Sequence, residues 1–404
     1  MKEDADAPTT RHLKPDEVEA VPWTNDEPCC EDIASRLLET GTPLEKRLAE
    51  AWRQKCPDIR TVEDIPHRMR QCGSKHVLHF SPGRAAKRVM GKPITDAFVP
   101  RAPNGFDFSK VGSSEVLLAG REVFEEVVKA GEDDNYDITE DTKNPTGVRV
   151  LLNLHPIAPL HVLLLPPGLE EQFLSESGIR VGLRFASRCK SMRLTFNGMG
   201  AGASVNHLHW QATVFPESVG IDSCQRVLWR SRKVLGNRNS PTTSCPSSRR
   251  EISDSGGAVV SIYRIPDWPL KSMCEVRWEQ EEPVDAFEEG NGGSGQEHLL
   301  IIEDALTATL LPMVQRMQKE NVTHNLSIYP GGRRITVAAR HFFCPQSENP
   351  SAMAGAALET LGHWIIPSLE DYESSTEESL GALWSSLSIP EEERIERFFL
   401  GEDG

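Results

Sequence analysis

Two histidines and a glutamine, His207, His209 and Gln211, alternate with apolar residues directly after a glycine-rich run from Asn197 to Ser204. This alternation predicts a β-strand over residues 206–214, and side chains two residues apart on a strand share one face. An imidazole flanked by another imidazole and a carboxamide is suited to attack phosphorus, because its neighbours fix its tautomer and donate to phosphate oxygens. The glycines let backbone N–H groups approach a phosphate closely. The pattern therefore favours a phosphate-handling site.

The same spacing is open to two other interpretations. Neutral imidazoles are common zinc ligands, and two polar residues also occur together on an ordinary solvated sheet face. The chain has no Cys-x-x-Cys pair, so a cysteine-based zinc site would need ligands from scattered positions. We expect no metal and no other cofactor, with the zinc site kept as a rival interpretation.

The charge balance limits the class of partner. The 404 residues include 44 Lys and Arg and 60 Asp and Glu, which gives a formal net charge of -16. Nucleic acid and anionic membranes require a basic surface, so neither is expected as the main partner. Small phosphorylated ligands need only a few local basic residues. Nine cysteines without paired spacing, and an N-terminus without a signal or transit pattern, predict a cytoplasmic protein.

The order of predicted elements indicates an α+β fold with helices packed on an antiparallel sheet. Strands are predicted at 75–80, 148–154, 161–165, 192–197, 206–214, 325–329 and 334–339, and helices at 31–52, 114–130, 174–189 and 299–320. The strands at 148–154 and 161–165 flank a short proline-containing turn and should form a hairpin.

Composition divides the chain into four segments. They are a flexible acidic tail at 1–30, a catalytic domain at 31–220, a loop-rich connection at 221–297 and a smaller α+β part at 298–404. The boundaries rest on two stretches that read as long surface loops, 236–257 and 279–296.

Several motifs resemble a known group of enzymes. The string NLHPIAPLHVLLLP at 153–166 and the string from 198 to 211 resemble the histidine triad superfamily. More narrowly, FDFSKVG at 106–112, ASVNHLH at 203–209 and LGHW with DYE between 361 and 373 are similar to the GDP-hexose phosphorylases, which include GDP-D-glucose phosphorylase and plant GDP-L-galactose phosphorylase. The resemblance runs from about residue 65 to about 395 and implies a histidine-triad-like antiparallel sheet with a second, smaller α+β half.

The chain departs from this pattern at three positions. Leu160 stands where the superfamily usually has glycine before the histidine, and Trp210 replaces a smaller apolar residue. Gln211 takes the place of a third histidine, as it does in the plant branch and in galactose-1-phosphate uridylyltransferase. A glutamine there fits transfer of a nucleotidyl group to phosphate better than its loss to water. Residues 213–217 are less like the plant enzymes, which weakens any choice of sugar.

The resemblance implies roles for individual residues. His209 would attack the phosphorus next to guanosine, releasing a hexose 1-phosphate, and inorganic phosphate would then take the guanylyl group to give GDP. The expected supporting residues are His207 and Gln211 in catalysis, and Ser204, Asn197, His161 and Gly202 in substrate binding. Arg84, Lys87 and Lys110 are further candidates for binding the anionic substrate because they are basic, with an ordinary charged surface as the alternative interpretation. His363 matches the family without an assigned role. The expected partners are GDP-hexose and phosphate, with subunits paired as a homodimer.

Three other functions remain open at this point. A nucleotide-sugar or dinucleotide hydrolase would use the same histidine with water as acceptor. A different nucleotidyl transfer would act on uracil or adenine nucleotides, and a non-catalytic protein would only bind the nucleotide. The sequence does not decide between GDP-D-glucose and GDP-L-galactose as the physiological sugar nucleotide, because a few hydroxyl contacts make that choice.

Overall fold

The computed structural model describes residues 30–55, 68–82, 94–102, 105–124, 147–158, 160–214, 220–234, 258–280, 294–342 and 355–401. The expected tail apart from residue 30, the expected loop 236–257, and residues 281–293 of the second expected loop lie outside these ranges.

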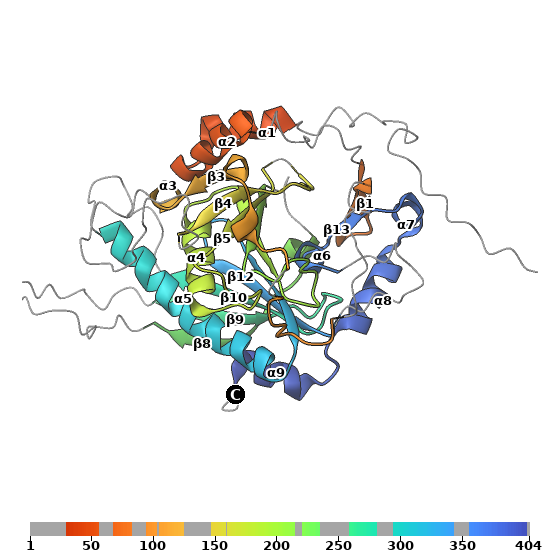
Figure 1. The fold of residues 1–404 in the computed structure, drawn as a ribbon. Coiled ribbons are helices and arrows are strands. Elements are labelled where there is room, and N and C mark those ends of the chain that lie inside the picture. Colours follow the sequence, from red (N-terminus) through yellow and green to blue (C-terminus); the bar gives the residue numbers. More distant parts are fainter. Residues whose placement is uncertain are drawn as a thin grey trace, which may run out of the picture.

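A ten-stranded antiparallel sheet forms the centre of the fold (Figure 1). In spatial order its strands are β3 (Val116–Ala119), β4 (Arg149–Leu152), β5 (Val162–Leu165), β7 (Trp210–Val214), β6 (Met192–Asn197), β11 (Thr323–Ile328), β12 (Arg334–Arg340), β10 (Met273–Gln280), β9 (Ala258–Arg264) and β8 (Val227–Lys233). The hairpin β4–β5 confirms the expected antiparallel pair, and β11–β12, at the strands predicted over 325–329 and 334–339, forms a second hairpin. Strands from both sides of residue 220 belong to this one sheet.

Helices cover one face of the sheet, as expected for an α+β fold. They are α1 (Cys30–Thr40), α2 (Pro43–Lys55), α4 (Glu176–Ser187), α5 (Ser294–Lys319) and α9 (Glu392–Leu400), and one apolar cluster joins them to the strands. Trp210 shows how the strand faces are assigned. Its fully buried ring lies on the helix side, where Nε1 donates to the carbonyl oxygen of Gly178 in α4 over 2.9 Å.

A second, smaller layer packs on the opposite face. It contains the sheet β1 (Arg68–Cys72), β2 (His76–Phe80) and β13 (His363–Ile366) and the helices α6 (Ala357–Thr360), α7 (Leu369–Ser374) and α8 (Glu377–Leu387). Its core includes Leu78, Trp364 and Trp384, and it reaches Met273 and Ala338 of the large sheet. Figure 1 shows this layer to the right of the large sheet, with α4 and α5 on the left.

A row of polar residues crosses the large sheet on the face toward the smaller layer. Gln211 lies opposite Thr195, Thr195 opposite Ser327, Ser327 opposite Thr336, and Thr336 opposite Glu275. Directly opposed residues of antiparallel strands share a face. The polar end of the predicted histidine motif therefore continues into a polar stripe that crosses four further strands, β6, β11, β12 and β10.

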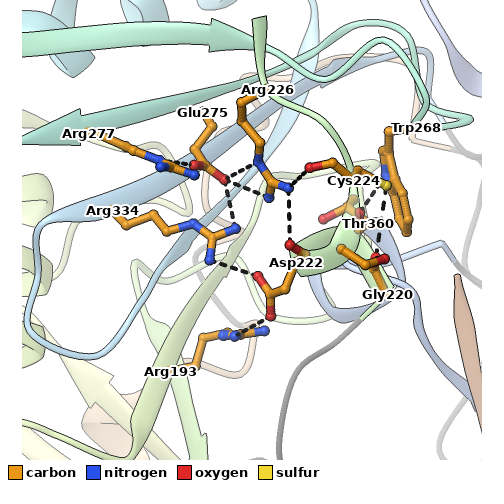
Figure 2. A network of polar contacts seen from close by, with 11 residues as sticks. Arg193, Gly220, Asp222, Cys224, Arg226, Trp268, Glu275, Arg277, Arg334 and Thr360 are labelled. Carbon is orange, nitrogen blue, oxygen red and sulfur yellow. Dashed lines mark hydrogen bonds and ion pairs between the residues drawn. The ribbon is translucent and has the colours of Figure 1, made fainter.

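An ion-pair network closes the far end of this stripe (Figure 2). Glu275 is fully buried and bonds to Arg334 over 2.8 Å and to Arg226 over 3.0 Å, while Asp222 bonds to Arg334 over 2.7 Å. Burial favours the protonated carboxyl, but the hydrogen bond and charge of Arg334 and the charge of Arg226 outweigh it and hold the pKa of Glu275 below its ordinary value. Asp222 belongs to the 3₁₀ turn Gly220–Ser223, whose Ile221 N–H donates to the Leu361 carbonyl over 3.4 Å. The network thus fastens the smaller layer to the sheet.

The secondary structure differs from the prediction in four places. The single helix at 31–52 is two helices, because Thr42 and Glu45 cap each other's backbone N–H groups and start α2 afresh. Residues 116–119, expected in the helix 114–130, form β3, which pairs with β4. The strands β8, β9 and β10 were not predicted at all. The predicted strand 206–214 begins only at Trp210.

No helix within the described ranges has the length and hydropathy needed to cross a membrane.

Candidate active site

The segment that carries both histidines lies directly before β7, which is an inner strand between β5 and β6. The Leu208 N–H donates to the Glu170 carbonyl over 2.9 Å, and the His209 N–H donates to Gln172 Oε1 over 2.9 Å. Leu208 is buried and faces α4, where its Cδ2 lies against Gly178. Both histidine rings lie beside Phe108 instead, with centroids 5.5 Å and 5.1 Å from its ring. The two histidines therefore share a side opposite Leu208, as the alternation predicted.

The imidazole of His209 is fixed in one tautomer. Its Nδ1 lies 2.7 Å from the carbonyl oxygen of His207. Because a carbonyl oxygen only accepts, Nδ1 carries the proton and Nε2 keeps its lone pair. The side chain is buried. This geometry presents one basic nitrogen of defined direction, which a nucleophilic histidine requires.

His207 connects two backbone segments. Its Nδ1 accepts a hydrogen bond from the Phe108 N–H over 3.0 Å, and the ring also hydrogen bonds to the backbone of Gly168. Burial lowers the pKa of His207 below its ordinary value, although the Gly168 bond and the charge of Asp107 act in the opposite direction. The neutral ring holds the 106–110 segment against the catalytic segment.

His161 and Gln211 meet on the same side of the sheet. His161 Nδ1 accepts from the Ile157 N–H over 3.2 Å, and Nε2 lies 3.1 Å from Gln211 Oε1. Asn153 Nδ2 also lies 3.1 Å from Nε2, but the Ile157 N–H occupies the Nδ1 lone pair, so Nε2 carries the proton and donates to the amide oxygen of Gln211. The Gln211 NH₂ group is thereby turned away from His161. Leu160, just before this histidine, adopts the left-handed φ of 55° that glycine would accept without strain.

The glycine-rich run lies against the smaller layer, at the residue that precedes α6. Gly202 has a φ of 103°, and a Cβ there would come within 2.6 Å of Ala356 Cβ. Gly202 and Ser204 are exposed, and within the described ranges neither of their N–H groups donates to a backbone carbonyl. Both amides are available to an anion.

Asn197 joins the run to the rest of the fold. Its Oδ1 accepts from Asn325 Nδ2 over 3.0 Å and from the Ala357 N–H over 2.7 Å. The side-chain oxygen of this expected substrate-binding residue is thus bonded to β11 and to the start of α6.

Of the three basic residues expected to bind substrate, the structure describes only Lys110. Lys110 is exposed in the 3₁₀ turn Phe108–Lys110, and its Nζ donates to the Gly105 carbonyl. Arg84 and Lys87 lie outside the described residues. The structure adds Arg149, which the sequence gave no reason to select. It is buried on β4, donates to the Phe108 carbonyl over 3.3 Å and lies close enough to His207 to lower the pKa of that ring.

His363 belongs to the other layer. It lies on β13, with Nε2 3.2 Å from His79 Nδ1 on β2. Burial, together with the nearby charge of Arg193, lowers its pKa to about 4. Among the described residues, no three His, Cys, Asp or Glu side chains come together as they would around a metal ion.

Sequence comparison agrees with this arrangement. Residues 60–213 match the family described as "GDPGP1-like, N-terminal domain", and residues 246–396 match "GDPGP1-like, C-terminal domain". The chain belongs to the GDPGP1-like family. The family match includes His161 and the whole His207–Gln211 motif in its N-terminal part, and the ion-pair residues Glu275 and Arg334 in its C-terminal part.

Curated relatives of the family are GDP-hexose phosphorylases. The chain is 25% identical to GDP-L-galactose phosphorylase 2 of Arabidopsis thaliana over 78% of this chain and 65% of that protein. It is 22% identical to GDP-D-glucose phosphorylase 1 of Danio rerio over 90% of this chain and 88% of that protein. It therefore spans just under two thirds of the length of the Arabidopsis relative.

The fold has a counterpart among solved structures. Yeast Ap4A phosphorylase Apa2 in complex with AMP superposes with a TM-score of 0.50 at 13% identity, covering 86% of this chain and 97% of that one. This likeness confirms the α+β architecture with a large antiparallel sheet.

Proposed function

We propose that the protein is a GDP-hexose phosphorylase that converts a GDP-hexose and inorganic phosphate into a hexose 1-phosphate and GDP. The observation that carries the proposal is the His209 imidazole, whose Nδ1 is bonded to the His207 carbonyl so that the lone pair lies on Nε2, the nitrogen that attacks. Membership of the GDPGP1-like family and the names of its relatives support the substrate class.

In the first step, the Nε2 lone pair of His209 attacks the phosphorus attached to guanosine. The bond from that phosphorus to the bridging oxygen breaks, and the oxygen leaves with the electron pair as part of the hexose 1-phosphate. The imidazole gains positive charge as the P–N bond forms. The His207 carbonyl oxygen, 2.7 Å from Nδ1, accepts a hydrogen bond from the Nδ1–H group and stabilises this charge.

In the second step, an oxygen of inorganic phosphate attacks the same phosphorus. The P–N bond breaks, its electron pair returns to Nε2, and GDP leaves with His209 restored. Neither step requires a net proton transfer to the ring, because Nδ1 stays protonated throughout.

Negative charge grows on the non-bridging oxygens in both steps and needs donors placed in advance. Gln211 supplies its NH₂ group, which His161 orients by binding the amide oxygen. The exposed amides of Gly202 and Ser204 supply backbone donors, and Lys110 supplies a nearby positive charge. His207 acts through position, since it holds the Phe108 segment against the nucleophile.

The sugar is open between D-glucose and L-galactose, because relatives of both names match the chain. The experiment is an assay of GDP release from GDP-D-glucose, GDP-L-galactose and GDP-mannose, with and without inorganic phosphate. Phosphate-dependent formation of GDP and hexose 1-phosphate supports the proposal and ranks the sugars. GMP formation in the absence of phosphate would indicate a hydrolase instead.

A further inference from the structure

The side chain of Gln172 is fully enclosed and makes three hydrogen bonds to the backbone of the catalytic region. Its Oε1 accepts from the His209 N–H over 2.9 Å. Its Nε2 donates to the Asn197 carbonyl over 2.8 Å and to the His209 carbonyl over 3.2 Å. Only 1% of the residue is exposed. One carboxamide thus contacts the nucleophile's own peptide groups on both sides.

These bonds stand where a sheet bond would otherwise form. The β6–β7 ladder runs from Met192 opposite Val214 to Thr195 opposite Gln211 and ends there. Continuing that register would pair Asn197 with His209. The Gln172 amide lies between these two residues and links the His209 N–H to the Asn197 carbonyl through its own acceptor and donor. A carboxamide has the same kinds of donor and acceptor as a peptide group, so the Gln172 side chain takes the place of a peptide group in the ladder.

The segment that carries Gln172 is itself fixed to the catalytic segment. The Gln172 N–H donates to Asn206 Oδ1 over 2.9 Å, and the Leu208 N–H donates to the Glu170 carbonyl over 2.9 Å. The backbone around Gln172 is therefore held in place by bonds other than those to His209. The side chain loses its rotamer freedom once, when the protein folds.

We propose that Gln172 is a positioning residue for the nucleophile, and this inference rests on the proposed role of His209. By occupying the ladder position, the amide stops the pairing of β6 with β7 from extending to Asn197 and His209. The His209 backbone is held apart from Asn197, in the conformation that lets Nδ1 reach the His207 carbonyl.

Two substitutions separate this role from mere packing. Gln172→Leu removes donor and acceptor but keeps a side chain of similar volume. Gln172→Glu keeps the acceptor, but its carboxylate faces two carbonyl oxygens and repels them. Once protonated, the introduced carboxyl both accepts from the His209 N–H and donates to the Asn197 carbonyl. Its surroundings favour that neutral form and raise its pKa above the ordinary value of about 4.3.

We expect Gln172→Leu to lower kcat about 100-fold with a much smaller change in KM, because displacement of a reacting group by about 1 Å has that effect on rate. For Gln172→Glu, the ratio of its kcat to that of the parent should rise as the pH falls from about 8 to about 5.5. The matched control is Gln318→Leu, which removes a glutamine whose Nε2 donates to the Leu174 carbonyl over 3.3 Å, away from His209. It should retain the parental kcat.

A substrate-free measurement makes the test independent of the reaction. In the full chain labelled with ¹⁵N-histidine, the His209 signals, identified by their loss in His209→Asn, should show the Nδ1–H tautomer in the parent and a mixture in Gln172→Leu. A parental kcat and an unchanged tautomer in Gln172→Leu would overturn the inference. If the parent turned over no GDP-hexose but the tautomer still changed, the positioning role would stand and the proposed function would fail.

Discussion

His161 Nε2 lies 3.1 Å from Gln211 Oε1, across the boundary between β5 and β7. The bond comes from two parts of the sequence 50 residues apart and fixes the amide oxygen of Gln211 on the side of His161. A glutamine that was free to flip would present its oxygen to the phosphate half of the time. In the proposed mechanism, this relationship gives His161 an orienting role that does not require contact with the substrate.

Replacement of His161 by leucine should lower kcat about 100-fold, because Gln211 loses its orientation and acts as an oxyanion donor only part of the time. Steady-state kinetics with a GDP-hexose and phosphate measure this. His341→Leu, at an exposed histidine, is the control and should keep the parental rate. An undiminished kcat in His161→Leu would remove the orienting role.

Alanine at Gly202 should lower both stability and kcat. The φ of 103° is unfavourable for any residue with a Cβ, and the added methyl would come within 2.6 Å of Ala356 Cβ, so we expect a loss of roughly 1–3 kcal/mol. Shifting the Gly202 and Ser204 amides should also weaken phosphate binding. Denaturant unfolding and kcat measurements test both effects.

Gly381→Ala provides the contrast. This glycine is inside α8, and a Cβ there meets no atom within 4 Å. Alanine should stabilise the protein by roughly 0.5–1 kcal/mol and leave kcat unchanged. If the two alanine variants behaved alike, the glycine-rich run would have no special backbone requirement.

The ion-pair network should contribute to stability in a pH-dependent way. Glu275→Gln leaves Arg334 and Arg226 facing a neutral group in a buried site and should cost roughly 3–5 kcal/mol. Because the folded-state pKa of Glu275 is lowered, its contribution is complete above the unfolded pKa of about 4.3 and declines as pH falls toward the folded value. The stability difference between parent and variant should therefore be constant near neutrality and shrink in acid.

Urea unfolding at several pH values measures that difference. The control is Glu320→Gln, because Glu320 pairs with Arg394 and Arg397 at a partly exposed site. We expect it to cost no more than about 1 kcal/mol. A cost for Glu275→Gln no larger than that of the control would show that the network does not hold the two layers together.

The sequence predicted the parts of the fold that have strong local patterns. The strand at 192–197 coincides with β6, and the apolar runs around the turn before His161 form the β4–β5 hairpin. The alternation around the histidine motif predicted a strand over 206–214, and the part from Trp210 onward forms β7. These elements carry period-two patterns or short apolar runs bounded by turn residues, which are typical of strands.

Other elements depend on contacts that no local pattern encodes. The four apolar residues of β3, Val116–Ala119, suit a helix or a strand equally, and pairing with Arg149–Leu151 decides between them. β8 is mostly exposed and lacks the alternation of a half-buried strand. The β-branched residues of β9 are typical of a strand, but the Gly/Ser-rich residues before them suggested a loop. Gln172 has no motif, because its function lies in the loop geometry that carries it to His209.

Trapping the covalent intermediate tests the central claim most directly. The parent and His209→Asn are each incubated with a GDP-hexose in the absence of phosphate, and then analysed by mass spectrometry of the intact chain and of its peptides. We predict that the parent gains one guanylyl group on His209 with release of an equal amount of hexose 1-phosphate, that added phosphate discharges it as GDP, and that the variant gains none. A parent that forms GDP in the presence of phosphate but never carries a guanylyl group, or a variant that is labelled to the same extent, would contradict the account.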